Sequence, residues 1–153
     1  MKCALTGHRT LRGFKEEVMK REIDRLIEQG ADTFYCGMAV GFDLTVCEYL
    51  IGKAKVIACI PYPDQAERYS EEDREKYRSL LEKCYGKVVM CYAYQDDCYK
   101  LRNYYMVDEC DEVYAFFNGN RRSGTYQTVN YAMKRGKKVI YHDALGIDET
   151  GKH

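Results

Sequence analysis

The sequence predicts a single α/β domain with a Rossmann-like, three-layer fold, in which helices cover both faces of a mostly parallel sheet. Three observations support this prediction. The chain has 153 residues, which is the size of one domain. Short apolar runs alternate along it with stretches of helical periodicity. The apolar runs are continuous rather than alternating, which is typical of strands covered on both faces.

The first half of the chain alternates strands and helices. In the first helix Met19, Ile23 and Leu26 recur at three- and four-residue spacing, and Gly30 can end the helix. The third strand is stopped by a Pro-Tyr-Pro run that begins at Pro61. The predicted strands are 2–6, 33–36 and 55–60, and the predicted helices are 14–29 and 42–51.

The second half continues this alternation. Ser70 starts a charged helix, and Ser70 with Asp73 fits a capping box, in which each side chain bonds an N–H of the first turn. Gly136 closes the last helix. We therefore expect one domain over 1–145 and a polar C-terminal tail over 146–153. The further predicted strands are 87–92, 112–117 and 138–141, and the further predicted helices are 98–109 and 125–135.

Composition bounds the partners and the compartment. The 24 Lys and Arg residues equal the 24 Asp and Glu residues, so net charge does not attract the chain to nucleic acid or to an anionic membrane. No apolar stretch approaches the roughly 20 residues of a membrane span, and we expect no signal peptide. The eight cysteines form no CxxC pair, and most lie in apolar runs. We therefore expect buried, reduced cysteines and a cytoplasmic protein.

Ligands of open α/β sheets bind beyond the carboxyl ends of the strands, where three loops of this chain stand out. The first loop runs from Thr6 to Arg9. Gly7 allows the backbone to approach a ligand closely, and Arg9 can pair with a phosphate or a carboxylate. The alternative interpretation is a tight strand-to-helix turn with a solvated arginine.

The second loop covers residues 37–43 and contains two glycines between a strand and a helix. Gly37 and Gly41 suit a loop whose N–H groups face an anion at the start of the helix. Asp43 can accept a hydrogen bond from a ribose hydroxyl, or it can cap the helix and favour its dipole. The spacing differs from the GxGxxG fingerprint of dinucleotide dehydrogenases.

The third loop covers residues 118–125. Ser123, Gly124 and Thr125 offer backbone N–H groups and two hydroxyls at a helix N-terminus, which suits a phosphate, and Arg121 and Arg122 add positive charge. The alternative is a flexible polar loop beside a capped helix. No GK[ST] triplet ends the loop, so it is not a Walker loop.

Further candidates lie on the predicted helix 98–109. Arg102 and Asn103 belong either to the site or to a solvated helix face. Tyr104 and Tyr105, or Phe116 and Phe117, can flank a base or pack in the core.

Only His8 among the histidines lies near a proposed site, and no acidic cluster accompanies it, so we expect no metal and no cofactor.

Together these loops resemble the SLOG superfamily, named for the SMF/DprA proteins and the LOG phosphoribohydrolases, and within it the small YpsA-like branch. The resemblance covers nearly the whole chain. It is carried by the segments Thr6 to Arg9, 37–43, Arg102–Asn103 with 106–108, and 123–125 followed by Val129 and Ala132.

The resemblance implies a Rossmann-like fold, a nucleotide-type ligand and a homo-oligomer. Some relatives hydrolyse the N-glycosidic bond of a nucleoside monophosphate and carry a GGxGTxxE pattern with a catalytic glutamate. Here Thr128 stands at the glutamate position, and Arg122 and Ser123 replace the residues before the conserved Gly-Thr pair. A threonine hydroxyl cannot replace a carboxylate as a general base at neutral pH. Asp43 is therefore left as the candidate acidic group.

Three functions follow as hypotheses. The first is a binding or sensing domain that holds the phosphate of a nucleotide on N–H groups near Gly41 and Gly124, with Arg9 or Arg102 as ion-pair partner and Asp43 on the ribose. The second is a nucleotide N-glycosidase or a related transferase with Asp43 as its acidic group. The third is an interaction module for single-stranded nucleic acid or protein, which the neutral charge does not favour.

Overall fold

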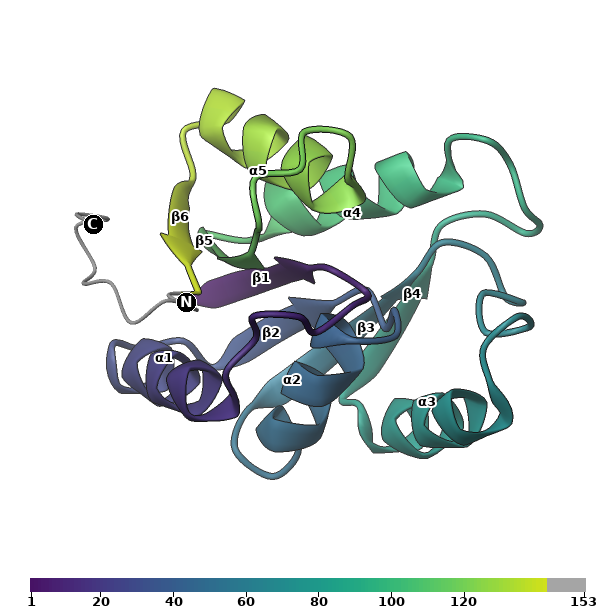
Figure 1. Cartoon of the computed structure of the whole chain (residues 1–153), viewed down its shortest axis with the longest axis horizontal. Helices are drawn as coiled ribbons and strands as arrows, with labels where there is room; N and C mark the ends of the chain where they lie inside the picture. Colours follow the sequence, from purple (N-terminus) through teal and green to yellow (C-terminus); the bar gives the residue numbers. More distant parts are fainter. Residues whose placement is uncertain (143–153) are drawn as a thin grey trace.

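A computed structural model describes residues 1–142 and contains one sheet of six strands (Figure 1). The strands lie in the order β4-β3-β2-β1-β5-β6, and every neighbouring pair is parallel. This confirms the α/β prediction, with a sheet that is parallel throughout. The strands are β1 (Lys2–Gly7), β2 (Thr33–Cys36), β3 (Lys55–Ile60), β4 (Gly86–Val89), β5 (Glu112–Phe116) and β6 (Lys138–Tyr141).

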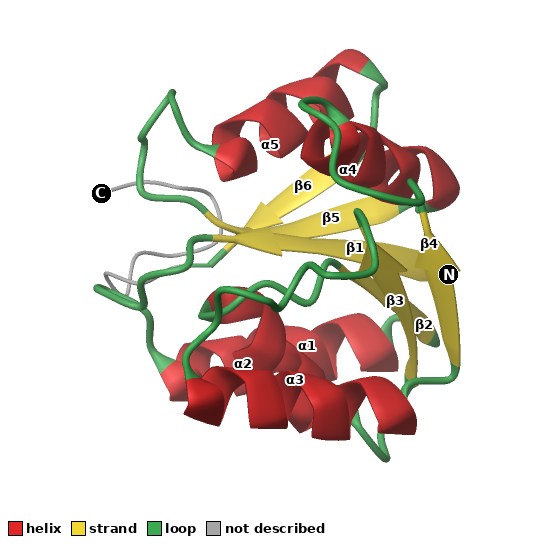
Figure 2. Ribbon diagram, turned by 90° about the vertical axis from the view of Figure 1, so that its right-hand side faces the viewer, coloured by secondary structure: helices red, strands yellow, loops and turns green. Residues whose placement is uncertain are grey.

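Helices cover both faces of the sheet in two separate layers. Figure 2 shows α1, α2 and α3 below the sheet and α4 and α5 above it. The chain builds outward from β1 to β4 and then crosses back to β5, beside β1. The two adjacent strands β1 and β5 thus lead to helices on opposite faces, and the loops diverge there to leave a crevice. The helices are α1 (Glu16–Glu28), α2 (Phe42–Leu50), α3 (Glu71–Lys83), α4 (Cys98–Glu109) and α5 (Gly124–Lys134).

Burial of both faces of the sheet explains why the strands are apolar without interruption. Successive side chains of a strand point to opposite faces, so Leu5 packs in the cluster beneath the sheet while Ala4 packs in the cluster above it. In β5, Tyr114 and Val113 divide between the two clusters in the same way. Both faces are therefore buried, as the sequence indicated.

Some predicted boundaries shift at the ends of elements. The fourth strand, predicted over 87–92, runs from Gly86 to Val89 at the edge of the sheet. The N–H groups of Met90 and Cys91 still bond the carbonyls of Ile60 and Pro61, at 2.9 and 3.1 Å. The first helix begins at Glu16 rather than at residue 14. The remaining predicted boundaries hold to within a residue, and the tail predicted over 146–153 lies outside the described residues.

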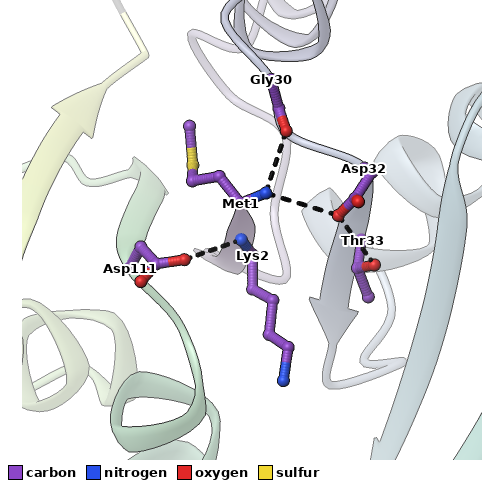
Figure 3. Close-up of polar contacts among 6 residues, drawn as sticks. All are labelled: Met1, Lys2, Gly30, Asp32, Thr33 and Asp111. Atoms are coloured by element: carbon purple, nitrogen blue, oxygen red, sulfur yellow. Dashed lines mark hydrogen bonds and ion pairs between the residues drawn. The ribbon is translucent and has the colours of Figure 1, made fainter.

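The amino ends of the strands are joined by polar contacts around the first two residues (Figure 3). The ammonium group of Met1 donates to the carbonyl of Gly30 at 2.9 Å and lies 3.5 Å from Oδ1 of Asp32. The N–H of Lys2 donates to Oδ2 of Asp111 at 2.9 Å. These contacts connect β1 to the turns that precede its two neighbours, β2 and β5. They lie at the amino ends of the strands, opposite the carboxyl ends where the candidate site lies.

The cysteines are all unpaired, and six of the eight are buried. Over residues 1–142 no three or more His, Cys, Asp or Glu side chains lie in an arrangement that can hold a metal ion. In the same part of the chain no helix has the length and apolar character needed to cross a membrane.

Candidate functional site

A cavity of about 360 Å³ lies at the carboxyl ends of the strands, next to the crevice between β1 and β5. It is walled by the loops after β1 and β2, by α4 and by the start of α5. Nine of the candidate residues line it although they come from four separate segments, whereas Gly41 does not. They are Gly7, Arg9, Gly37, Asp43, Arg102, Asn103, Ser123, Gly124 and Thr125.

Arg102 is the most deeply placed cation of the cavity. Its side chain is buried, and Nη1 donates to the carbonyls of Gly37, at 2.6 Å, and Cys59, at 3.0 Å. Nε donates to Oδ1 of Asn103 at 2.8 Å. A solvated helix face is therefore the wrong interpretation of Arg102. Within residues 1–142 its Nη2 makes no hydrogen bond, so this nitrogen has a donor that the protein does not use.

Asp43 is a buried carboxylate near this guanidinium. Its Oδ2 accepts the N–H of Ala39 at 3.2 Å, so it organises the preceding loop, while its Oδ1 has no hydrogen-bond partner. Burial raises the pKa of Asp43 to about 6, against the opposing effects of Arg102, the Ala39 N–H and Arg9. The group is thus mainly ionised at neutral pH. Its Oδ1 is an unused hydrogen-bond acceptor, and a buried polar atom normally has a hydrogen-bond partner.

The glycines allow two loops to pack closely. Gly41 has φ +83°, and a Cβ at this position would overlap the carbonyl oxygen of Arg9. A Cβ on Gly7 would overlap the ring of Phe42, whose N–H donates to the carbonyl of His8 at 3.1 Å. Gly41 therefore lets the loop after β2 pack against Arg9, although Gly41 does not line the cavity. The first N–H of α2, that of Phe42, already bonds the protein and is not available to an anion.

The start of α5 presents donors that have no protein partner. The Oγ of Ser123 accepts the N–H of Tyr126 at 3.0 Å and so caps the helix. In the described chain, no acceptor bonds the N–H groups of Gly124 and Thr125, and both residues line the cavity. These N–H groups and the positive end of the helix dipole favour an anion at this position.

The residue at the glutamate position of the hydrolase pattern does not line the cavity. Thr128 is buried and donates its Oγ1 hydrogen to the carbonyl of Gly124 at 2.9 Å. Arg121 and Arg122 do not line the cavity but an adjoining hollow beside Tyr104, which shares Ser123 and Gly124 with it. Arg9 is the exposed arginine among the lining residues.

Two rings also line the cavity, that of His8, which the sequence placed near a proposed site, and that of Tyr99, which the sequence analysis did not single out. His8 accepts the N–H of Asn118 on Nε2 at 2.9 Å, and burial lowers its pKa, against a smaller opposing effect of the Asn118 side chain. The guanidinium of Arg102 lies 5.6 Å from the ring centre of Tyr99. Their spacing of three residues on one helix was the available signal, because such residues share a face.

The aromatic residues proposed to flank a base lie elsewhere. Tyr104 stacks on Tyr131 with ring centres 3.8 Å apart, and Tyr105 lies beside Tyr35. Phe116 is buried in the core beneath the sheet. None of these rings lines the cavity.

Comparison with known proteins gives one family and several similar structures. The model of the YspA SLOG family matches residues 8–147. No curated protein matches the chain. Among solved structures, DNA processing protein A (DprA) from Helicobacter pylori, described for its single-stranded DNA binding mode, has a TM-score of 0.65 at 19% identity. DprA from Streptococcus pneumoniae has a TM-score of 0.66 at 19% identity, and the protein TM1055 has 0.59 at 15%.

Each alignment covers 92% of this chain. The chain spans only 64% and 49% of the two DprA chains and 73% of TM1055. At these identities the likeness shows a shared fold.

Proposed function

The chain belongs to the YspA SLOG family, and we propose that it binds a nucleotide or a nucleotide-derived ligand in the cavity at the carboxyl ends of its strands. One observation carries the proposal. Groups from three segments converge on this cavity with hydrogen-bonding capacity unused, namely the N–H groups of Gly124 and Thr125, Nη2 of Arg102 and Oδ1 of Asp43. Among these groups Oδ1 of Asp43 is a buried polar atom, and such atoms are rarely left without a hydrogen-bond partner.

The unused groups divide into two kinds that match the two polar parts of a nucleotide. The N–H groups of Gly124 and Thr125 suit a phosphate, and the exposed Arg9 supplies a counter-charge at the rim. The carboxylate of Asp43 suits a donor, such as a ribose hydroxyl, since an ionised carboxylate only accepts hydrogen bonds. A volume of about 360 Å³ is within the usual range for small-ligand sites.

The absence of a glutamate at Thr128 favours binding or sensing over hydrolysis. Because Thr128 bonds within its own helix, no group at that position can deliver charge or a proton to a ligand in the cavity. The proposed role is therefore that of a domain that reports the presence of its ligand.

The test records melting temperature and free base together, with AMP, adenosine and inorganic phosphate as probes. We expect AMP to raise the melting temperature without base release, because a ligand present at about 100 times its dissociation constant adds about 2.7 kcal/mol to the stability of the folded state. Arg9→Ala should reduce this shift. Arg12→Ala is the matched control, since Arg12 is exposed on the same loop outside the cavity.

The proposal fails if neither AMP nor a wider set of nucleotides shifts the melting temperature of the wild type. It also fails in its placement of the phosphate if Arg9→Ala and Arg12→Ala bind AMP equally well.

A second candidate, a nucleotide N-glycosidase, is favoured by Asp43. A buried carboxyl group in the cavity with a pKa of about 6 can carry or accept a proton near neutral pH. If the same incubation releases free base, and Asp43→Asn abolishes this release, the glycosidase function replaces the binding function.

Single-stranded nucleic acid is the third candidate, supported by the shared fold of the DprA proteins. Binding of that kind depends on phosphate contacts and weakens steeply with salt. Titration of an oligonucleotide at two salt concentrations would therefore distinguish it from binding of a single nucleotide.

A further inference from the structure

A second hollow, of about 720 Å³, lies beside the cavity of the proposed nucleotide site. Its walls come from the loop between β3 and α3 and from the loop before α4. Arg9 and Tyr99 line both spaces, so the hollow and the cavity adjoin at these two side chains. The two spaces thus lie next to each other, as the two halves of a ligand longer than one nucleotide would require.

Tyrosine rings dominate the second hollow. Tyr62 lies edge-on to Tyr94 and to Tyr99, with ring centres 5.5 and 6.0 Å apart. A side-chain hydrogen bond with Tyr99 raises the pKa of Tyr62 to about 12. The ring of Tyr94 remains 59% exposed. Exposed aromatic faces beside a polar cavity suit the stacking of a base.

Hydrogen bonds join the loop between β3 and α3, which lines the second hollow, to the loop after β2, which lines the first cavity. Gln65, which is buried, donates to the carbonyl of Gly37 at 2.8 Å. Tyr69 donates to the carbonyl of Met38 at 3.0 Å. Both acceptors belong to the loop after β2, which leads into the first turn of α2 and Asp43. The second hollow therefore keeps a fixed position relative to the first cavity, as a two-part site requires.

The charges differ between the two spaces. The first cavity offers unbonded N–H groups that suit a phosphate, whereas the second contains Glu67 and Asp73 as well as Arg68. Carboxylates repel phosphate but accept hydrogen bonds from sugar hydroxyls and base amino groups. Arg9 lies where the spaces meet, which is the position of a linking phosphate.

We propose that the tyrosine-lined hollow is a subsite for a second nucleoside, so that the ligand carries two nucleosides joined through phosphate. This inference rests on the proposed function of the first cavity. Two sources share this chemistry, a free dinucleotide joined by a pyrophosphate and two successive nucleotides of a single strand.

The experiment measures affinity by calorimetry for three probes, namely AMP, NAD as a pyrophosphate-linked dinucleotide, and a thymidine dinucleotide with a 5′-phosphate. The test variant is Tyr94→Ala. The matched control is Tyr92→Ala, because Tyr92 is fully exposed on the same loop and lines neither space.

We expect at least one dinucleotide to bind more tightly than AMP. Tyr94→Ala should weaken that dinucleotide by about tenfold, the effect of losing one stacking contact of about 1.4 kcal/mol. The same variant should leave AMP unchanged, and Tyr92→Ala should leave all three probes unchanged. The probe that loses affinity in Tyr94→Ala identifies the source, NAD for a free dinucleotide and the thymidine dinucleotide for a strand.

The inference is overturned if AMP binds and neither dinucleotide gains affinity, or if Tyr94→Ala and Tyr92→Ala behave alike. In both of these cases the proposed function of the first cavity survives. If none of the three probes binds, the inference fails, and the proposed function fails with it only if the wider set of nucleotides also leaves the melting temperature unchanged.

Discussion

The guanidinium group of Arg102 lies directly against Gly37. Nη1 donates to the Gly37 carbonyl at 2.6 Å, and a Cβ on Gly37 would lie 2.6 Å from this nitrogen and 3.0 Å from Oδ2 of Asp43. The missing side chain thus provides the space in which an arginine and an aspartate of the candidate site lie close together. This relationship explains why the loop after β2 begins with glycine.

Gly37→Ala should displace Arg102 and Asp43. Forcing a methyl group into a packed position costs about 1–3 kcal/mol, so we expect a loss of this size in the free energy of unfolding, measured with urea, together with weaker AMP binding. Gly124→Ala is the control for stability, because the nearest atom to its Cβ would be Nδ2 of Asn103 at 4.0 Å. A wild-type unfolding midpoint for Gly37→Ala would contradict the packing described here.

Gly41→Ala and Gly52→Ala form a matched pair at the two ends of α2. Both glycines have positive φ, +83° and +87°, so both alanine variants bear the backbone strain of about 1–2 kcal/mol. Only at Gly41 does the added Cβ also overlap the Arg9 carbonyl, whereas the space around Gly52 is open. We expect Gly41→Ala to lower the melting temperature at least twice as much as Gly52→Ala and to abolish AMP binding. Equal losses would show that the two loops are not packed together.

Asp43→Asn should change how stability depends on pH. The folded-state pKa of about 6 lies above the ordinary value of 3.8 for an aspartate, so the folded protein binds the Asp43 proton more tightly than the unfolded chain. The resulting stabilisation is full below about pH 4 and is lost as pH rises through 6. Relative to Asp43→Asn, the wild type should therefore lose about 3 kcal/mol over this range, at 1.36 kcal/mol per pKa unit.

Urea unfolding of both proteins at pH 4 and pH 7.5 measures this difference. Asp96→Asn, in an exposed loop, is the control and should follow the wild type. The Asp43→Asn variant should also bind AMP more weakly, since the amide lacks the charge of the carboxylate. A constant stability difference between wild type and Asp43→Asn across this range would contradict the buried carboxylate.

Ser123→Ala and Ser70→Ala remove the same kind of helix cap at two sites. Ser123 accepts the N–H of Tyr126 at 3.0 Å, and Ser70 accepts that of Asp73 at 3.1 Å. Each variant should lose about 1 kcal/mol of stability in urea unfolding. AMP affinity should fall only in Ser123→Ala, because this cap holds the N–H groups of Gly124 and Thr125 toward the cavity. If Ser70→Ala weakens AMP binding as much, the phosphate lies elsewhere.

The order of strands and helices was readable from the sequence because burial on both faces leaves a local pattern. The strands over 33–36 and 55–60 and the helix over 98–109 have the predicted bounds. The convergence of the candidate loops was also predictable, because parallel strands bring their carboxyl ends to one edge. Ser70 was readable as a cap, with its Oγ accepting the N–H of Asp73.

Tertiary structure alone decided what each candidate side chain can do. Arg102 is buried because the carbonyls of Gly37 and Cys59, 65 and 43 residues away in the chain, accept its hydrogen bonds. Asp43 keeps an unused oxygen and a raised pKa because distant segments exclude water around it. Hydrophobic periodicity is local, whereas desolvation and hydrogen-bond partners depend on which remote segments meet, and the sequence pattern does not carry that information.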